Sequence, residues 1–232
     1  MISAHIEKLL TENHPRTVAL RQYLSNACTE FENSGLADKN FIRELTSGSV
    51  QKFWACVSEA LIFVRLGEKH FGTRAAIGKG PDFLVMDGTR KVWIEVVCPE
   101  PINVPTNWLD PIPGKEITFP HEEILLRWTS AIRVKAEKLV GSQDETHKGY
   151  LSSGLVAPAD AYVIAVNGCQ LSNGQFPELF GISQFPFAVE AVFPVGPYQV
   201  KIDRDTLKAV DCGHQHRPFV SNQNARVPQL NL

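Results

Sequence analysis

The sequence predicts an α/β fold with a mixed central sheet flanked by helices and preceded by further helices at the N-terminus. Two observations predict this class. Apolar residues recur at helical spacing over the first 46 residues, and the order helix, strand, strand, helix, strand follows them. The helix before the last strand must return the chain to the sheet, which makes that strand pair parallel. We therefore expect an N-terminal helical extension at 1–46 and one compact α/β unit at 47–232.

The composition is ordinary for a globular protein. Of 232 residues, 44% are hydrophobic and 21% charged, and the net charge of −2 gives no global positive field for a polyanionic partner. No apolar run is long enough to span a membrane and no signal peptide begins the chain, so we expect a cytoplasmic protein without a membrane partner. Five cysteines without a C-x-x-C pair argue against a disulfide framework and against a Cys-rich zinc site.

The first 66 residues are expected to be helical. Three helices that serve packing are expected at 2–12, 15–33 and 38–46. A stronger helical pattern covers 49–66, where Glu59 is the only charged residue between Phe53 and Val64. Burying an unpaired carboxylate is costly, so Glu59 should have a partner: a cation, a donor network or a metal-bound water.

A β-hairpin is expected next, with strands at 81–86 and 91–98 around Asp87-Gly88. Alternation places Glu95 in the middle of the second strand, on the face opposite Ile94. A two-residue loop would put Asp82 diagonally from Glu95, at about 7–8 Å, and a four-residue loop would put it directly opposite. Only a three-residue loop would separate the two carboxylates onto different faces.

The second half alternates loops, a helix and strands. Residues 99–120 contain six prolines and no period, which indicates either a functional loop near Glu95 or a stiff surface excursion. An amphipathic helix is expected at 121–140, with Arg127, Lys135 and Lys138 on a basic line beside its apolar stripe. Strands are expected at 161–167, 188–193 and 198–202, with a turn at 203–206.

Carboxylates on one sheet face, with a third from an apolar helix, form an oxygen-only donor set suited to Mg²⁺ or Mn²⁺. Such a site is suited to phosphodiester hydrolysis, because the metal stabilises the charge that develops on the phosphoryl group. Cys212, His214 and His216 offer potential zinc ligands, but alternate residues of an extended chain do not close a tetrahedral site by themselves. An exposed polar loop is the simpler expectation there.

The acidic residues carry a family resemblance. Glu59 on a helix, Gly80-Pro81-Asp82 at the start of a strand and Trp93-Ile94-Glu95-Val96-Val97 in the next strand resemble the core of the PD-(D/E)XK nuclease superfamily. The resemblance covers about residues 49–167 and implies a restriction-endonuclease-like fold. It also implies that Asp82 and Glu95 bind the divalent metal, and that Glu59 supports the metal through water.

The sequence departs from the family at one position. The family's lysine, two residues beyond the strand acid, is Val97 here. Some members supply the cation from the following helix, so we expect the Lys135 ammonium, or failing it that of Lys138, near the carboxylates. Lys135→Ala is expected to slow cleavage by orders of magnitude and to leave folding nearly intact. Arg127 and Lys138 are the candidate contacts for a nucleic-acid phosphate.

These features predict a Mg²⁺- or Mn²⁺-dependent nuclease, with DNA endonuclease as the first interpretation. A homodimer would suit a double-strand cutter. The alternative is a catalytically silent domain of the same fold that binds nucleic acid or protein, since Val97 is also what a decayed site would contain. A structural partner protein without a nucleic-acid role is a third interpretation, and the choice between DNA and RNA stays open.

Overall fold

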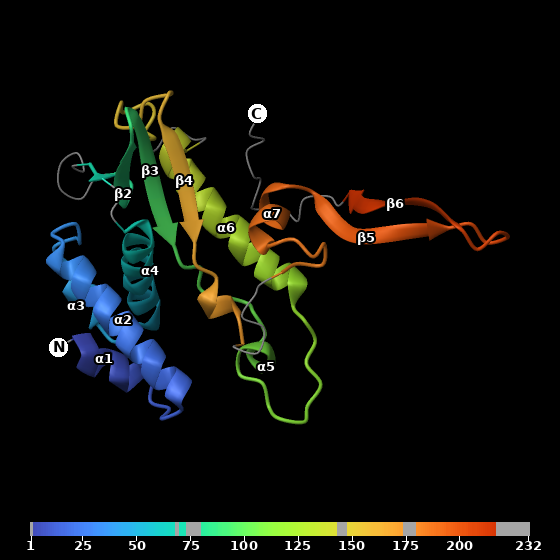
Figure 1. Ribbon diagram of the computed structural model, residues 1–232, viewed down its shortest axis with the longest axis horizontal. Coiled ribbons are helices and arrows are strands. Elements are labelled where there is room, and N and C mark those ends of the chain that lie inside the picture. The colour runs from blue at the N-terminus through green and yellow to red at the C-terminus, as the bar shows by residue number, and fades with distance from the viewer. Residues whose placement is uncertain (1, 68–69, 73–79, 143–147, 174–179, 217–232) are drawn as a thin grey trace. The chain divides into compact units, whose positions relative to one another are not determined.

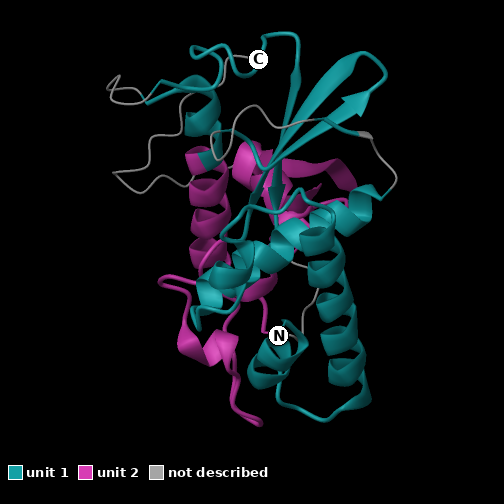
Figure 2. Cartoon of the chain, turned by 90° about the vertical axis from the view of Figure 1, so that its left-hand side faces the viewer, with its two compact units in different colours: residues 1–98, 135–167 teal, residues 99–134, 168–232 magenta. Residues whose placement is uncertain are grey.

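The computed structural model describes residues 2–67, 70–72, 80–142, 148–173 and 180–216. The chain is mixed α/β and divides into two compact units, one of residues 1–98 and 135–167 and the other of residues 99–134 and 168–232 (Figure 2). In chain order the elements are α1 (Ile2–Leu9), α2 (Pro15–Asn33), α3 (Phe41–Leu45), α4 (Val50–Leu66), β1 (His70–Phe71), β2 (Phe83–Asp87), β3 (Arg90–Val97), α5 (Thr106–Leu109), α6 (His121–Val140), β4 (Ala161–Val166), a 3₁₀ turn (Cys169–Leu171), α7 (Phe187–Val192), β5 (Val195–Ile202) and β6 (Ala209–His216). None of the helices in these ranges is long and apolar enough to cross a bilayer.

The division differs from the expected boundary between 46 and 47. Helices α1 to α3 share a single hydrophobic core with α4 and with strands β2 and β3. At its centre, the Phe31 ring lies 5.1 Å from that of Phe41, 5.3 Å from Phe63 and 5.6 Å from Phe83, measured between centroids. Because this core is continuous, the N-terminal helices belong to the same unit as the sheet rather than forming an extension.

Unit 1 contains a four-stranded sheet in the order β1-β2-β3-β4 (Figure 1). Strands β2 and β3 pair antiparallel, while β3 and β4 pair parallel, which confirms both predicted relations. The hairpin turns at Gly88-Thr89 and pairs Met86 with Lys91. Continued by one residue beyond the pairing of Phe83 with Ile94, this register sets Asp82 directly opposite Glu95.

The two faces of β3 have different neighbours in unit 1. Ile94 and Val96 point into the core that contains α4. Helix α4 begins at Ser49, whose side chain accepts the Lys52 N–H, and ends at Gly67, which has a φ of 56°. Trp93 and Glu95 point to the other face, where the last turns of α6 and the chain that follows them lie. Helix α4 and the end of α6 therefore cover opposite faces.

Unit 2 corrects one expected strand. Residues 187–192 form helix α7 and not a strand, because a short apolar run fits both periods and Pro186 at the N-cap sets the helical start. The helix orients Glu190, whose buried carboxylate contacts the imidazole of His121 at 2.6 Å and accepts the Ser183 N–H at 2.7 Å.

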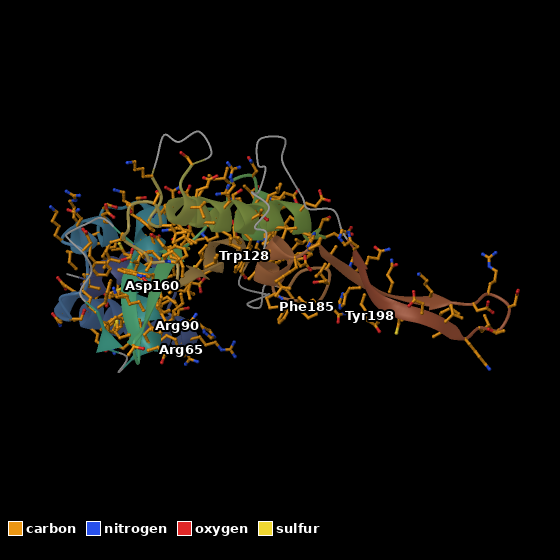
Figure 3. All side chains as sticks on the ribbon, turned by 90° about the horizontal axis from the view of Figure 1, so that it is seen from above. Arg65, Arg90, Trp128, Asp160, Phe185 and Tyr198 are labelled. Carbon is orange, nitrogen blue, oxygen red and sulfur yellow. The ribbon has the colours of Figure 1, made fainter. Side chains whose placement is uncertain are left out.

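The rest of unit 2 contains the β5–β6 hairpin, which confirms the strand expected at 198–202 and its turn. The His214 ring lies between those of Phe185 and Tyr198, with centroids 5.0 and 5.3 Å away; both of these residues are labelled in Figure 3. Its Nδ1 lies 3.0 Å from the Gly196 carbonyl oxygen. His214 thus has a packing role, and Cys212 and His216 belong to the same strand instead of to a loop.

The burial of the cysteines leads to a test of this fold. Burial raises the pKa of the Cys28 thiol from 9.0 to about 12 and that of Cys56 equally, with Glu59 and Glu44 adding to the second shift. Such a rise lowers the reactive thiolate fraction about 1,000-fold. Iodoacetamide at pH 8, followed by peptide mass spectrometry, should therefore label the exposed Cys212 more than about 100-fold faster than Cys28. Equal rates in the native protein would contradict the packing of α2 described above.

Candidate functional site

Two carboxylates meet where β2 and β3 begin to pair. Glu95 lies in the middle of β3 and is completely buried, with an exposed fraction of 0%. Asp82 immediately precedes β2, and its Oδ2 accepts the Val96 N–H at 2.6 Å. This hydrogen bond joins the β3 backbone to the Asp82 side chain one residue beyond the last strand pair, Phe83 with Ile94, and holds the Asp82 carboxylate beside Glu95.

Helix α6 supplies the cations that these carboxylates need. The Lys135 Nζ lies 2.5 Å from Glu95 Oε2 and 3.9 Å from Asp82 Oδ2, and its side chain is only 13% exposed. One turn later, the Lys138 Nζ lies 3.2 Å from the same Oε2, with 44% of its side chain exposed. The position of Lys135 agrees with the expected one, and Lys138 joins it because residues three apart share a helix face.

Two tyrosines complete the surroundings of this ion pair. The Tyr150 hydroxyl donates to Glu95 Oε1 at 2.9 Å, and the Tyr162 hydroxyl donates to the Lys135 carbonyl oxygen at 3.0 Å. Burial raises the pKa of Tyr162, and the charge of Glu95 adds to the rise, so this phenol stays protonated. Sequence reasoning missed Tyr150, since it lies in an irregular segment with no periodic signal. The Glu95 cluster is defined below as Asp82, Glu95, Lys135, Lys138 and Tyr150.

The charges around Lys135 determine its protonation state. Burial tends to lower the pKa of Lys135, but the charges of Asp82 and Glu95 and the hydrogen bond to Glu95 raise it above its ordinary value. Burial raises the pKa of Asp82; the Lys135 ammonium opposes this shift and the Glu95 charge adds to it. Lys135 is therefore protonated at neutral pH, which suits it to donate hydrogen bonds and to stabilise negative charge, not to accept a proton.

Glu59 does not complete a three-carboxylate metal site. Within the described ranges, no three His, Cys, Asp or Glu side chains form a group able to hold a metal ion. The reason is the sheet: α4 packs on the face of Ile94 and Val96, whereas Glu95 points to the opposite face. From α4 it is Ser58 that contacts the end of β4, where its hydroxyl accepts the Asn167 side-chain N–H at 2.9 Å.

Arg127, expected to contact a phosphate, has an intramolecular partner. Its Nε donates to the Glu100 carbonyl oxygen at 2.7 Å, and both residues belong to unit 2. All members of the Glu95 cluster belong to unit 1. The basic line of α6 thus divides, with Arg127 fixing the chain just after β3 and the two lysines reaching the carboxylates.

Comparisons of the chain with protein-family models, with curated proteins and with solved structures found no match in any of the three. The Glu95 cluster is therefore interpreted from its own geometry.

The burial of Lys135 corrects the expectation that removing it leaves folding nearly intact. Lys135→Ala takes the nearest cation from a fully buried carboxylate, and we expect the free energy of unfolding to fall by about 3 kcal/mol. That is the lower end for a broken buried pair, because Lys138 and Tyr150 still contact Glu95. Lys138→Ala, at a half-exposed position, should cost less than about 1 kcal/mol. Urea unfolding followed by circular dichroism measures both, and equal losses would argue against this difference in burial.

Proposed function

We propose that this protein hydrolyses phosphodiester bonds in nucleic acid with a divalent cation, and that DNA is the substrate to test first. The observation that carries the proposal is the ammonium of Lys135, which a helix holds within 4 Å of two carboxylates, one in β3 and the other immediately before β2. A cation beside a carboxylate pair suits the transfer of a phosphoryl group, because negative charge builds on the phosphoryl oxygens in the transition state.

The donor set fits Mg²⁺ or Mn²⁺ without Glu59. Mg²⁺ in proteins is usually held by one or two carboxylates, with waters and substrate phosphates completing its six ligands. Asp82 and Glu95 provide two carboxylates, and both are hard oxygen donors. They are the residues that would hold the ion, which would supply Lewis-acid stabilisation of the phosphoryl group.

Lys135 has the central role among the protein's own groups. Its protonated amine would donate a hydrogen bond to the attacking water or to a phosphoryl oxygen and offset the charge that forms there. The short distance to Glu95 keeps the amine in place, and the Tyr162 hydroxyl holds the helix backbone at the same residue. Val97, at the position of the family's lysine, leaves this task to α6.

Lys138 is the more exposed of the two lysines that contact Glu95. Its side chain is more than three times as exposed as that of Lys135, and it lies farther from Oε2. A flexible, half-exposed amine can turn from Glu95 to a phosphate at small cost. We therefore assign it to substrate binding and not to the chemical step.

The rival function is that of a catalytically silent domain of the same fold, which binds nucleic acid or protein. Its support is that Glu95 already has donors on both oxygens, from Lys135, Lys138 and Tyr150, which gives the buried carboxylate a purely structural explanation. The two functions differ in their need for a divalent cation.

Asp82→Asn and Glu95→Gln provide the first test of the proposed activity. With Mg²⁺ or Mn²⁺ present, the wild-type protein should cleave plasmid, linear or single-stranded DNA, and chelation should abolish cleavage. Each substitution replaces a charged carboxylate, which would be a metal ligand, by a neutral amide and should slow cleavage by about 100-fold or more. Gel electrophoresis over time measures the rates.

Asp160→Asn is the matched control, because it replaces another acid of unit 1 by its amide. Asp160 accepts hydrogen bonds from Trp93 and from the Ala157 N–H, and an amide oxygen can replace it there. The control should keep wild-type activity. DNA binding that persists without cleavage and is indifferent to chelation would establish the silent domain instead.

Lys135 and Lys138 should affect different steps. Lys135→Met keeps an apolar stem and removes the charge, and kcat should fall by about 100-fold while DNA affinity changes little. Lys138→Met should instead raise KM, with kcat within about a factor of 10, and should weaken the salt dependence of binding. Steady-state kinetics at several salt concentrations separate the two effects. A loss of kcat on Lys138→Met as large as that on Lys135→Met would refute this assignment.

A further inference from the structure

We propose that two copies of this chain associate through one apolar face of the hairpin formed by β5 and β6. In the described part of the chain these strands form a sheet of only two strands, which runs away from α7 within unit 2 (Figure 1). Residues 195–216, which comprise both strands and their turn, are called the β5–β6 ribbon below. The inference concerns unit 2 alone, and it holds whether the Glu95 cluster cleaves nucleic acid or is silent.

One face of the ribbon is polar, and its charges are paired. Lys201 of β5 lies opposite Asp211 of β6, and their charged groups approach to 2.8 Å. Gln199 shares this face with Lys201, because side chains alternate along a strand. Over the whole ribbon, three Lys and Arg residues balance three Asp residues. The ribbon therefore offers no net charge to nucleic acid or to an anionic surface.

The opposite face of the ribbon is apolar and exposed. Tyr198, Val200 and Ile202 alternate along β5 on this face, and they are 51%, 49% and 61% exposed. Across the ribbon, Val200 is paired with Cys212 and Tyr198 with His214, whose Nδ1 already contacts a carbonyl oxygen. Single exposed apolar residues are ordinary, whereas a contiguous row of them marks a surface that associates with another molecule.

A second copy of the ribbon fits this face. A two-stranded hairpin is at most marginally stable in water, whereas two ribbons stacked face to face give four strands around a shared apolar layer. A two-fold axis brings the same face of both copies together, so that face must be compatible with itself. Without Lys, Arg, Asp or Glu on it, no like charges meet, and the Lys201–Asp211 pair stays on the outside.

Sedimentation equilibrium of the full chain measures this association. The ribbon covers much less than the roughly 800 Å² per partner of a standard interface, so we expect a weak dimer with a Kd of about 30 µM. Val200→Lys places a charge at the centre of the apolar face and near its own copy, and the Kd should rise about 10-fold or more. Gln199→Lys is the matched control, because it adds the same charge to the neighbouring residue on the polar face. Its Kd should stay within about a factor of 2 of wild type.

Val200→Glu separates loss of contact from loss of folding. Alone it should weaken the dimer as Val200→Lys does, because two like charges again meet. An equimolar mixture of the two variants should associate at least about 10-fold more tightly than either variant alone, since opposite charges then face each other. Such a recovery requires that both variants keep a folded ribbon.

Cys212 reports the contact in the wild-type chain. It lies on the apolar face, whereas Cys169 is exposed elsewhere in unit 2. With the expected Kd, mass action predicts that iodoacetamide labels Cys212 about 4-fold more slowly at about 300 µM protein than at about 3 µM. The rate at Cys169 should not depend on protein concentration.

Several outcomes would overturn the assignment. A wild-type chain that is monomeric up to about 300 µM, ten times the expected Kd, would leave the face to a different protein. Equal weakening by Gln199→Lys and Val200→Lys, or a dimer that Val200→Lys leaves intact, would place the association on another surface. A mixture of the two Val200 variants that stays monomeric would contradict direct contact between the two faces. None of these measurements uses a cation or nucleic acid, so their failure would leave the proposed function untouched.

Discussion

The burial of one carboxylate, Glu95, is the constraint around which the centre of unit 1 is arranged. A carboxylate removed from water in the middle of a strand must be compensated by cations and hydrogen bonds, or it destabilises the fold by several kcal/mol. The compensation comes from three groups: the Lys135 and Lys138 amines from α6, and the Tyr150 hydroxyl from the segment after that helix. The Glu95 side chain therefore connects helix α6, strand β3 and the segment that contains Tyr150.

Much of this arrangement follows from local sequence pattern. Alternation along 91–98 is enough to place Glu95 on the face opposite Ile94. The sequence left the hairpin register open, and the observed pairing of Met86 with Lys91 is the one expected for the alternative that sets Asp82 directly opposite Glu95. The parallel pairing of β3 with β4 follows from the helix between them. The basic spacing of α6 identifies Lys135, because residues three or four apart share a helix face, and the last turns of α6 lie on the face of the sheet to which Glu95 points. Strong periodicity and short-range geometry are what made these features predictable.

The features that the sequence did not reveal depend on contacts between distant segments. Glu59 interrupts an apolar helix, which indicates burial but does not say which face of the sheet that helix covers. Tyr150 reaches Glu95 only because Gly149 allows a close approach to the end of α6, a steric fact that no periodicity reports. The five apolar residues at 188–193 satisfy either period, so the sequence predicts a strand there, and the hydrogen bonds of Glu190 that accompany the helix come from elsewhere in unit 2. The division into two units likewise depends on contacts between distant segments, because helices α1 to α4 share one hydrophobic core with strands β2 and β3.

The difference in burial between the two lysines connects the stability of the cluster with its proposed chemistry. Asp82 and Glu95 carry two negative charges when ionised, and Lys135 and Lys138 balance them, so the buried group is satisfied without any further ion. In the proposed function, Asp82 and Glu95 would hold a divalent cation, whose two positive charges would repel the amines and favour the departure of the one that is less firmly held. Lys135 is enclosed by protein, with 13% of its side chain exposed, whereas Lys138 is 44% exposed and can return to water at little cost. The amine released in this way is the one nearest solvent, where a phosphate would replace Glu95 as its partner. The difference in exposure between the two lysines is therefore the feature of the cluster on which the proposed division of their roles depends.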